Sequence, residues 1–159
     1  MSFDFNADDI LQLAIDIEKN GAVFYRASAA KIDDADAKTL LLSLADMEDE
    51  HEKTFRTLRR ALSESEKAST VFDPEGEAAL YLKALADTRV FFEKDIDSSI
   101  LEDILKEAIT AEKDSIVFYL GMKELVPEAL GKERIDVIIK EEMSHIKILS
   151  KALVAARKE

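Results

Sequence analysis

Two Glu-x-x-His pairs are the residues of this sequence best suited to chemistry. The first pair is Glu48 with His51, and the second is Glu142 with His145. The two pairs are separated by one interval of 94 residues, because 142 − 48 and 145 − 51 are equal. Residues three apart share a helix face, so each pair can present a carboxylate and an imidazole to the same space. These pairs use both histidines of the chain.

Two single glutamates, Glu18 and Glu112, repeat at the same interval of 94 residues. The pattern Ala-Ile-x-x-Glu-Lys-x-x-x-Val-Phe-Tyr surrounds both of them, beginning at Ala14 and again at Ala108. The chain is therefore interpreted as two copies of one helical hairpin. Pseudo-twofold packing of the copies would gather six side chains halfway along a bundle. They are Glu18, Glu48, His51, Glu112, Glu142 and His145.

Such a cluster favours a dinuclear metal site. Carboxylates and imidazoles bind iron or manganese, and a carboxylate can bridge two ions. Without metal, each of four buried carboxylates would face a penalty on the order of several kcal/mol. A single glutamate in a helical stripe is usually a solvated surface residue, and Glu50, Glu52 and Glu141 are interpreted in that way. The coincidence of two pairs, two single glutamates and one interval favours metal; the same ligands would also accept zinc.

Tyr25 and Tyr119 are further candidates, for a catalytic role. Each stands seven residues beyond a single glutamate, on the same predicted helix face two turns along. Their hydroxyls could donate hydrogen bonds to ligand carboxylates and serve in electron transfer. The alternative is two core tyrosines whose hydroxyls reach solvent or backbone.

Four long helices must position these residues. Apolar residues at steps of three and four predict helices from about Asn6 to Lys31 and from about 35 to 62. A third helix is expected to be capped by Asp97, Ser98 or Ser99, and Pro127 and Gly131 separate it from the fourth. The inward stripe of the fourth helix is Ile135, Ile138, Glu142, His145, Leu149, Ala152 and Ala156.

A long crossover is predicted between the two hairpins. Residues 63–70 are polar, Asp73-Pro74-Glu75-Gly76 is typical of a turn, and residues 77–92 favour a short helix. The apolar run Val90-Phe91-Phe92 could lie at a dimer interface or cap the bundle's own core.

Composition excludes several classes of function. The chain of 159 residues is expected to form one domain, 1–159, and its lack of cysteine excludes a thiolate zinc site, an iron–sulfur cluster or a rubredoxin-type centre. A net charge of −12 argues against nucleic acid and anionic membranes as partners. The acidic N-terminus lacks the features of a secretory signal, and no apolar stretch approaches a membrane span. A cytoplasmic location is the resulting expectation.

The six-residue pattern resembles the ferritin-like di-iron carboxylate bundles, in which two helices supply a Glu each and two supply Glu-x-x-His. The length, the duplicated hairpins and the Tyr after each single Glu are similar to the rubrerythrin group. The resemblance implies an all-α, ferritin-like four-helix bundle of two duplicated hairpins, with a long crossover that contains a short helix. It also implies two iron ions. Glu18 and Glu112 would be terminal ligands, Glu48 and Glu142 bridges, and His51 and His145 one nitrogen ligand for each iron.

The same resemblance implies a non-haem peroxidase that reduces hydrogen peroxide, and a homodimer. A chain without cysteine would need a separate electron donor, such as a rubredoxin. One departure leaves dioxygen open as the oxidant: Ser115 stands where the rubrerythrin group usually has an extra glutamate. Two alternatives stay open. One is a ferroxidase or iron-handling protein that oxidises Fe(II), and the other is a metal-independent helical interaction module.

Overall fold

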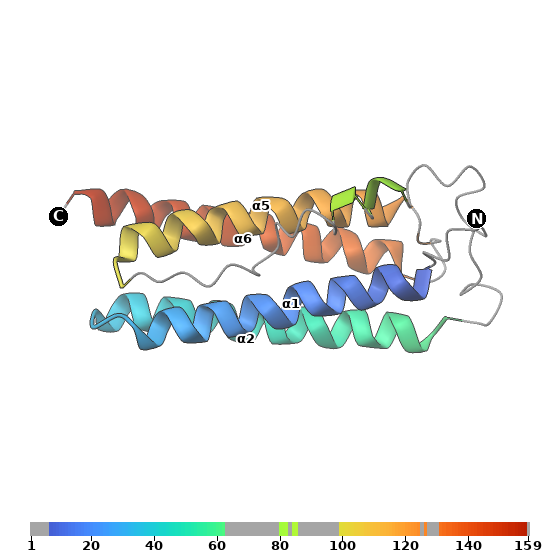
Figure 1. The fold of residues 1–159 in the computed structure, drawn as a ribbon, viewed down its shortest axis with the longest axis horizontal. Coiled ribbons are helices and arrows are strands. Elements are labelled where there is room, and N and C mark those ends of the chain that lie inside the picture. Colours follow the sequence, from blue (N-terminus) through green and yellow to red (C-terminus); the bar gives the residue numbers. More distant parts are fainter. Residues whose placement is uncertain are drawn as a thin grey trace.

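The computed structural model describes residues 7–62, 80–82, 84–85, 99–124, 126 and 131–158. These residues form long helices and no strand (Figure 1). The long helices are α1 (Ala7–Ala30), α2 (Ala35–Arg60), α5 (Leu101–Lys123) and α6 (Lys132–Arg157). Within the crossover, residues 80–82 and 84–85 are helical, as predicted for part of 77–92. The run Val90-Phe91-Phe92 and Pro127 lie outside the described residues.

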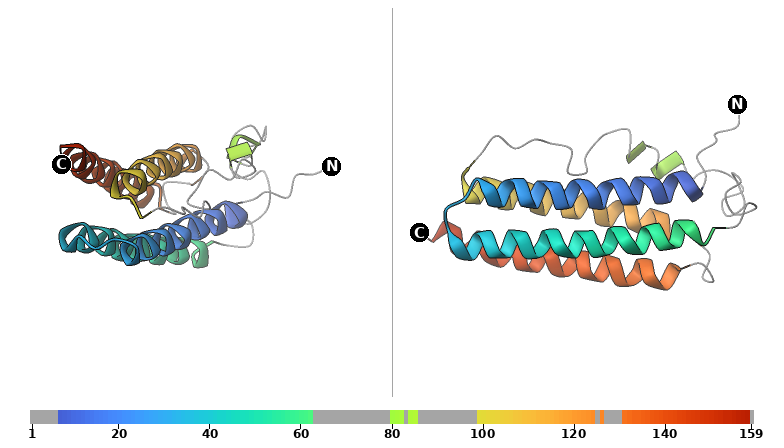
Figure 2. Two further views of the ribbon diagram at one scale, coloured as in Figure 1. Left: turned by 60° about the vertical axis from the view of Figure 1, so that its left-hand side comes forward. Right: turned by 90° about the horizontal axis from the view of Figure 1, so that it is seen from below.

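The four helices form two hairpins that lie face to face. α1 packs along α2 and α5 along α6, while α1 also contacts α5 and α2 contacts α6. Figures 1 and 2 show the hairpins as two layers, with α2 ending at the opposite end of the bundle from the start of α5. The two helix ends that the crossover joins therefore lie at opposite ends of the bundle. This architecture confirms the predicted all-α, ferritin-like bundle of two hairpins.

The helix boundaries follow from local chemistry, with one correction. Asp34 caps α2, because its side chain accepts a hydrogen bond of 2.8 Å from the amide of Ala37. Of the predicted caps of the third helix, Asp97 and Ser98 lie outside the described residues, and Ser99 is not the N-cap. α5 begins after Ile100, which makes no side-chain cap hydrogen bond. The acidic residues Glu102 and Asp103 in the first turn complement the positive helix N-terminus instead.

Gly131 is the N-cap directly before α6 and has a backbone conformation that suits glycine. Its φ is 128°, in a region that residues with a Cβ rarely adopt, and an added Cβ would meet the side chain of Leu58. The predicted break between the third and fourth helices is thus explained at Gly131 by both backbone conformation and space.

Two apolar clusters fill the bundle, one on either side of a polar layer. One includes Ile15, Phe55, Met122 and Ile135, and the other includes Leu41, Leu44, Ile104, Leu105 and Leu149. The polar layer contains the two Glu-x-x-His pairs, so these pairs lie halfway along the helices. In the stripe of α6, residues from Ile135 to Leu149 are buried, whereas Ala152 and Ala156 are only half-buried towards the helix end.

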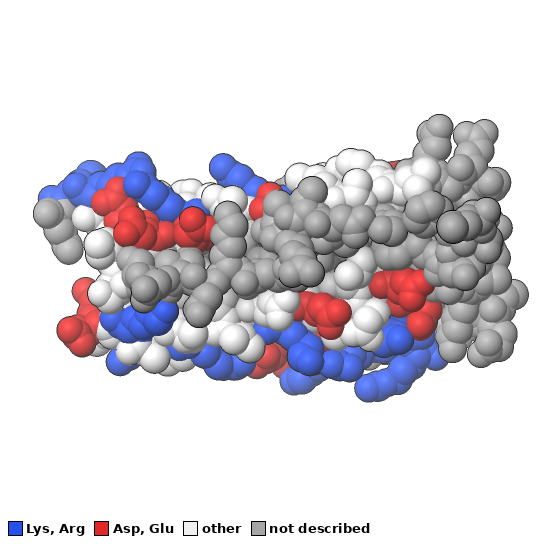
Figure 3. Space-filling model, viewed as in Figure 1, with Lys and Arg blue, Asp and Glu red and all other residues white. Residues whose placement is uncertain are grey.

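The outer surface carries both signs of charge. On the face shown in Figure 3, basic and acidic side chains both appear, and acidic groups do not form one continuous patch. None of the described helices has the length and apolar content needed to cross a bilayer.

Candidate metal centre

All six predicted ligands meet in the middle of the bundle. α1 supplies Glu18 and α5 supplies Glu112, while α2 and α6 each supply one Glu-x-x-His pair. None of the six is more than 3 % exposed, although all are polar or charged. Each residue lies on the inward stripe of its helix, so the periodicity of the sequence places them together without any irregular backbone.

The ligand atoms form two overlapping groups, each within 4.8 Å. One group is Glu18, Glu48, His51 and Glu142; the other is Glu48, Glu112, Glu142 and His145. Glu48 and Glu142 belong to both groups, whereas each histidine and each single glutamate belongs to one. Two adjacent positions that share two carboxylates are the arrangement in which those carboxylates can bridge two ions.

Both imidazoles turn the same nitrogen towards the carboxylates. His51 Nδ1 lies 2.8 Å from Glu142, 3.4 Å from Glu48 and 3.5 Å from Glu18. His145 Nδ1 lies 3.3 Å from Glu112, 3.4 Å from Glu142 and 3.6 Å from Glu48. The rings are nearly parallel, with centroids 5.7 Å apart. Nδ1 is therefore the candidate ligand atom of each histidine.

Several buried atoms of this cluster have no hydrogen-bond partner among the described residues. They are Glu48 Oε1, Glu112 Oε2, Glu142 Oε2 and His145 Nε2. Buried polar groups are almost always paired, and leaving one unpaired costs about 1–3 kcal/mol. Metal ions would satisfy the three carboxylate oxygens at once. The cluster therefore fits a dinuclear centre, and its oxygen and nitrogen donors suit iron or manganese and would accept zinc.

Two of the clustered carboxyls, those of Glu48 and Glu142, have a raised pKa in the metal-free protein. Burial, followed by the neighbouring charges of Glu18 and Glu142, raises the pKa of Glu48 well above its ordinary value. Burial and the charges of Glu18 and Glu112 raise the pKa of Glu142 to about 8. At neutral pH Glu142 therefore retains a proton, and the raised pKa of Glu48 favours its protonated form.

The histidines are held in the protonated form as well. Burial disfavours their charge, but hydrogen bonds to Glu142 and Glu18 outweigh it and raise the pKa of His51 to about 11. Hydrogen bonds to Glu112 and Glu142 likewise raise the pKa of His145 to about 9. Glu112 shows the reverse: burial opposes its charge, but hydrogen bonds with Glu142, His145 and Tyr25 lower its pKa to about 2. In the metal-free site, protons thus offset the negative charge of the carboxylates, as metal ions would in the loaded site. These protons must leave when metal binds.

The two tyrosines reach across the bundle to the site carboxylates. Tyr25 donates a hydrogen bond of 2.6 Å to Glu112, and Tyr119 donates one of 2.5 Å to Glu18. Both rings are fully buried. Burial and then the charge of Glu112 raise the pKa of Tyr25, and burial and then Glu18 raise that of Tyr119, so both hydroxyls stay protonated donors. Their part in electron transfer stays a prediction.

Ser115 is buried one turn after Glu112 and provides no carboxylate. Its hydroxyl donates a hydrogen bond of 2.9 Å to the carbonyl of Ala111, within the same helix. The two groups of candidate ligands therefore contain four glutamates, as the serine at position 115 led us to expect.

Glu141 contacts the cluster from outside, although the sequence analysis interpreted it as a solvated surface charge. Its Oε2 lies 2.5 Å from Nε2 of His51, on the side of the ring opposite the carboxylate cluster, although its own side chain is 47 % exposed. The available signal was its position directly before Glu142, since a residue beside a ligand on one helix can reach a ligand on the next. That signal is weak in a chain so rich in glutamate.

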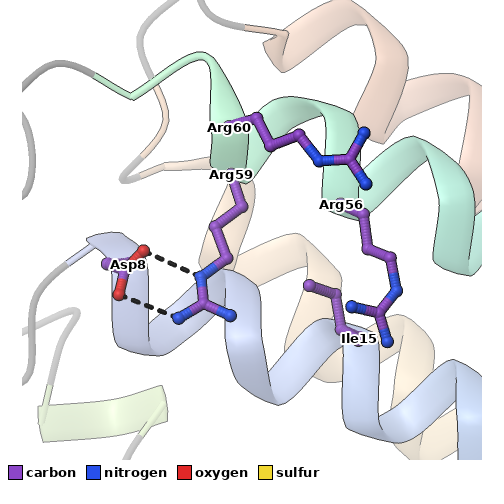
Figure 4. Close-up of a pocket in the computed structure, with 5 residues that line it drawn as sticks. All are labelled: Asp8, Ile15, Arg56, Arg59 and Arg60. Carbon is purple, nitrogen blue, oxygen red and sulfur yellow. Dashed lines mark hydrogen bonds and ion pairs between the residues drawn. The ribbon is translucent and has the colours of Figure 1, made fainter.

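A separate pocket of about 360 Å³ lies between α1 and α2 (Figure 4). It is lined by Asp8, Ile15, Arg56, Arg59 and Arg60. Arg59 bonds to both oxygens of Asp8 at 2.8 and 3.1 Å. Arg56 pairs with Glu52 at 2.8 Å. Two of the three arginines are thus neutralised within the chain, and none of the predicted ligands lines this pocket.

Comparison with known proteins agrees with the geometry. A crystal structure described as a ferritin-like diiron-carboxylate protein from Thermotoga maritima matches with a TM-score of 0.69 and 27 % identity. The match covers 93 % of this chain and 94 % of that one, and so includes both hairpins. No curated protein matches significantly in sequence. The Rubrerythrin family model matches residues 9–97, which include nearly all of the first hairpin, and the interval of 94 residues relates the second hairpin to it. The chain therefore belongs to the rubrerythrin family.

Proposed function

We propose that this protein is a di-iron oxidoreductase that acts as a non-haem peroxidase on hydrogen peroxide. The observation that carries the proposal is the buried cluster in which two carboxylates are shared by two histidine-containing groups. Membership of the rubrerythrin family and the likeness to a diiron-carboxylate protein support iron as the metal. Glu18 and Glu112 would be terminal ligands, Glu48 and Glu142 bridging ligands, and His51 and His145 the nitrogen ligands.

The bound iron pair would supply two electrons to an O–O bond. The chain's own residues prepare the site for that step. Tyr25 and Tyr119 hold Glu112 and Glu18 from the opposite hairpin, and the apolar clusters on both sides of the polar layer exclude bulk water. The carboxylates would otherwise repel one another, and hydrogen bonds that cross the bundle keep them in place.

Electrons must come from outside the described site. Reduction of one hydrogen peroxide to two waters consumes two electrons and two protons, and the chain has no cysteine to hold an iron–sulfur or rubredoxin-type centre. We therefore propose a separate donor such as a rubredoxin. A cytoplasmic homodimer is proposed with this function.

Stopped-flow absorbance tests the proposal. Protein loaded anaerobically with Fe(II) is mixed separately with hydrogen peroxide and with air-saturated buffer, and the near-ultraviolet absorbance of the oxidised iron pair is followed. We expect faster oxidation by peroxide, with two irons retained per chain. Glu142→Ala should lower both the iron stoichiometry and the oxidation rate. Glu50→Ala is the matched control, because Glu50 is 70 % exposed beside His51 and pairs only with Lys53 among the described ion pairs. Unchanged stoichiometry and rate in Glu142→Ala would refute the proposal.

A ferroxidase that oxidises Fe(II) with dioxygen is the second candidate, and Ser115 favours it. The buried serine bonds to its own helix and adds no carboxylate where the rubrerythrin group usually has one. The stopped-flow comparison separates the two functions, because a ferroxidase would react faster with dioxygen. Gel filtration after oxidation gives a second distinction: released iron identifies a substrate, whereas retained iron identifies a cofactor.

A further inference from the structure

The two candidate ligand histidines differ on the side of the ring that faces away from the carboxylate cluster. Nε2 of His51 lies 2.5 Å from Glu141 Oε2. Nε2 of His145 is buried and has no hydrogen-bond partner among the described residues. Around Nδ1 the two rings are alike, because each faces three carboxylates at 2.8 to 3.6 Å. The asymmetry is therefore confined to the outer nitrogen.

The duplicated sequence explains this asymmetry. Subtracting the interval of 94 from 141 gives 47, and position 47 is Met47. Met47 precedes Glu48 as Glu141 precedes Glu142, so it occupies in α2 the place that Glu141 occupies in α6. A thioether sulfur is only a weak acceptor, whereas a carboxylate is a strong one. The two copies thus provide one histidine, and not the other, with a strong acceptor.

This difference matters when a metal binds. A neutral histidine that binds metal through Nδ1 carries its proton on Nε2. A carboxylate that accepts this proton's hydrogen bond fixes the tautomer and the ring orientation and makes the ligand nitrogen more basic. Loss of such a partner typically lowers metal affinity about 10–100-fold. On His145 the same proton would be buried without a partner among the described residues, which opposes metal binding at that position.

We propose that Glu141 is a positioning residue for His51 and that it makes the two metal positions unequal. The position served by His51 binds a divalent metal more tightly than the position served by His145. This inference rests on the proposed two-metal site and deepens it, because it assigns an order of loading. Glu141 acts through His51 and is not itself a ligand.

Calorimetric titration of metal-free protein with Co(II), as a stand-in for Fe(II), tests the inference. For the wild type we expect two Co(II) per chain with unequal affinities. Glu141→Gln should weaken the tighter position about 10-fold or more and leave the weaker one unchanged. Glu50→Gln is the control. Glu50 precedes His51 in the sequence, but its side chain is 70 % exposed and pairs with Lys53 instead of the imidazole. This control variant should change neither affinity.

A spectroscopic measurement separates positioning from a general loss of structure. In the Co(II)-loaded protein, each ligand histidine should give one strongly shifted, solvent-exchangeable N–H proton resonance. Glu141→Gln should move one of the two resonances and leave the other in place. Movement of both or of neither would overturn the inference.

The mirror variant provides an independent test. Met47→Glu places a carboxylate at the position in α2 that corresponds to Glu141, and it should raise the weaker Co(II) affinity towards the tighter one. Equal affinities in the wild type, or no selective effect in either variant, would overturn the inference while leaving a two-metal site intact. Fewer than two Co(II) bound to the wild type would overturn the proposed site itself, and this inference with it.

Discussion

In the metal-free protein, the free energy of unfolding should fall as the pH rises from 6.5 to 8. In the metal-free fold, the pKa of His145 is raised to about 9, that of His51 to about 11 and that of Glu142 to about 8. A histidine whose pKa is raised on folding stabilises the fold fully at a pH below 6.5, its pKa in the unfolded chain. This contribution is lost as the pH rises towards the pKa in the folded chain. Glu142 acts in the same direction, because the unfolded chain releases its proton near pH 4.5 while the folded chain keeps it until about pH 8.

The slope of the free energy of unfolding against pH follows from the number of protons that the folded chain retains and the unfolded chain releases. Each such proton lowers the free energy of unfolding by about 1.4 kcal/mol per pH unit. Between pH 6.5 and 8, one retained proton would cost about 2 kcal/mol and three would cost about 6 kcal/mol. For a chain of this length, about 1 kcal/mol shifts Tm by about 2–4 °C. The midpoint should therefore fall by at least about 4 °C over this range.

Thermal unfolding of chelator-treated protein, followed by far-ultraviolet circular dichroism at pH 6.5 and pH 8, measures this slope. Glu142→Gln should flatten it, because an amide does not titrate and the variant also removes a partner of both histidines. Glu50→Gln, in which an exposed glutamate is changed, should keep the wild-type slope. A midpoint that stays constant or rises with pH in the metal-free wild type would refute the assignment of buried protons to this cluster.

Three further predictions concern the loaded site and the fold. Metal loading at pH 7 should release up to three protons per chain, because the pKa values of His51, His145 and Glu142 are raised to about 11, 9 and 8. Calorimetry in buffers of different ionisation enthalpy measures this release, and heats independent of buffer would contradict it. Tyr119→Phe removes the hydrogen bond to Glu18 and should destabilise the metal-free protein by about 1–3 kcal/mol in urea unfolding. The exposed Tyr81→Phe should stay within about 0.5 kcal/mol, and equal effects of the two variants would argue against the bond. Gly131→Ala places a Cβ against Leu58 at a residue whose φ is 128°. The variant should lower the free energy of unfolding by at least about 1 kcal/mol in the same assay. An unchanged urea midpoint would show that the alanine is not strained at this position.

The sequence by itself determined the helices and the residues that meet between them. Glu48, His51, Glu142 and His145 lie on inward stripes that local periodicity defines, and the interval of 94 residues relates each pair to its copy. A side chain on the inward face of a bundle helix must meet the other inward faces at the same level. The cluster therefore followed from spacing alone, as did the pairing of helices into two hairpins.

Only the tertiary structure decided which side chains are partners across the bundle. Tyr25 shares a helix face with Glu18, yet its hydroxyl bonds to Glu112 of the other hairpin. Glu141 lies among many exposed glutamates, and only its distance to His51 distinguishes it. The sequence likewise did not indicate that α5 begins without a side-chain cap hydrogen bond. Such contacts depend on the rotation of each helix about its axis and on the lateral spacing of the hairpins. These quantities are set by packing of the whole bundle, so no local sequence pattern contains them.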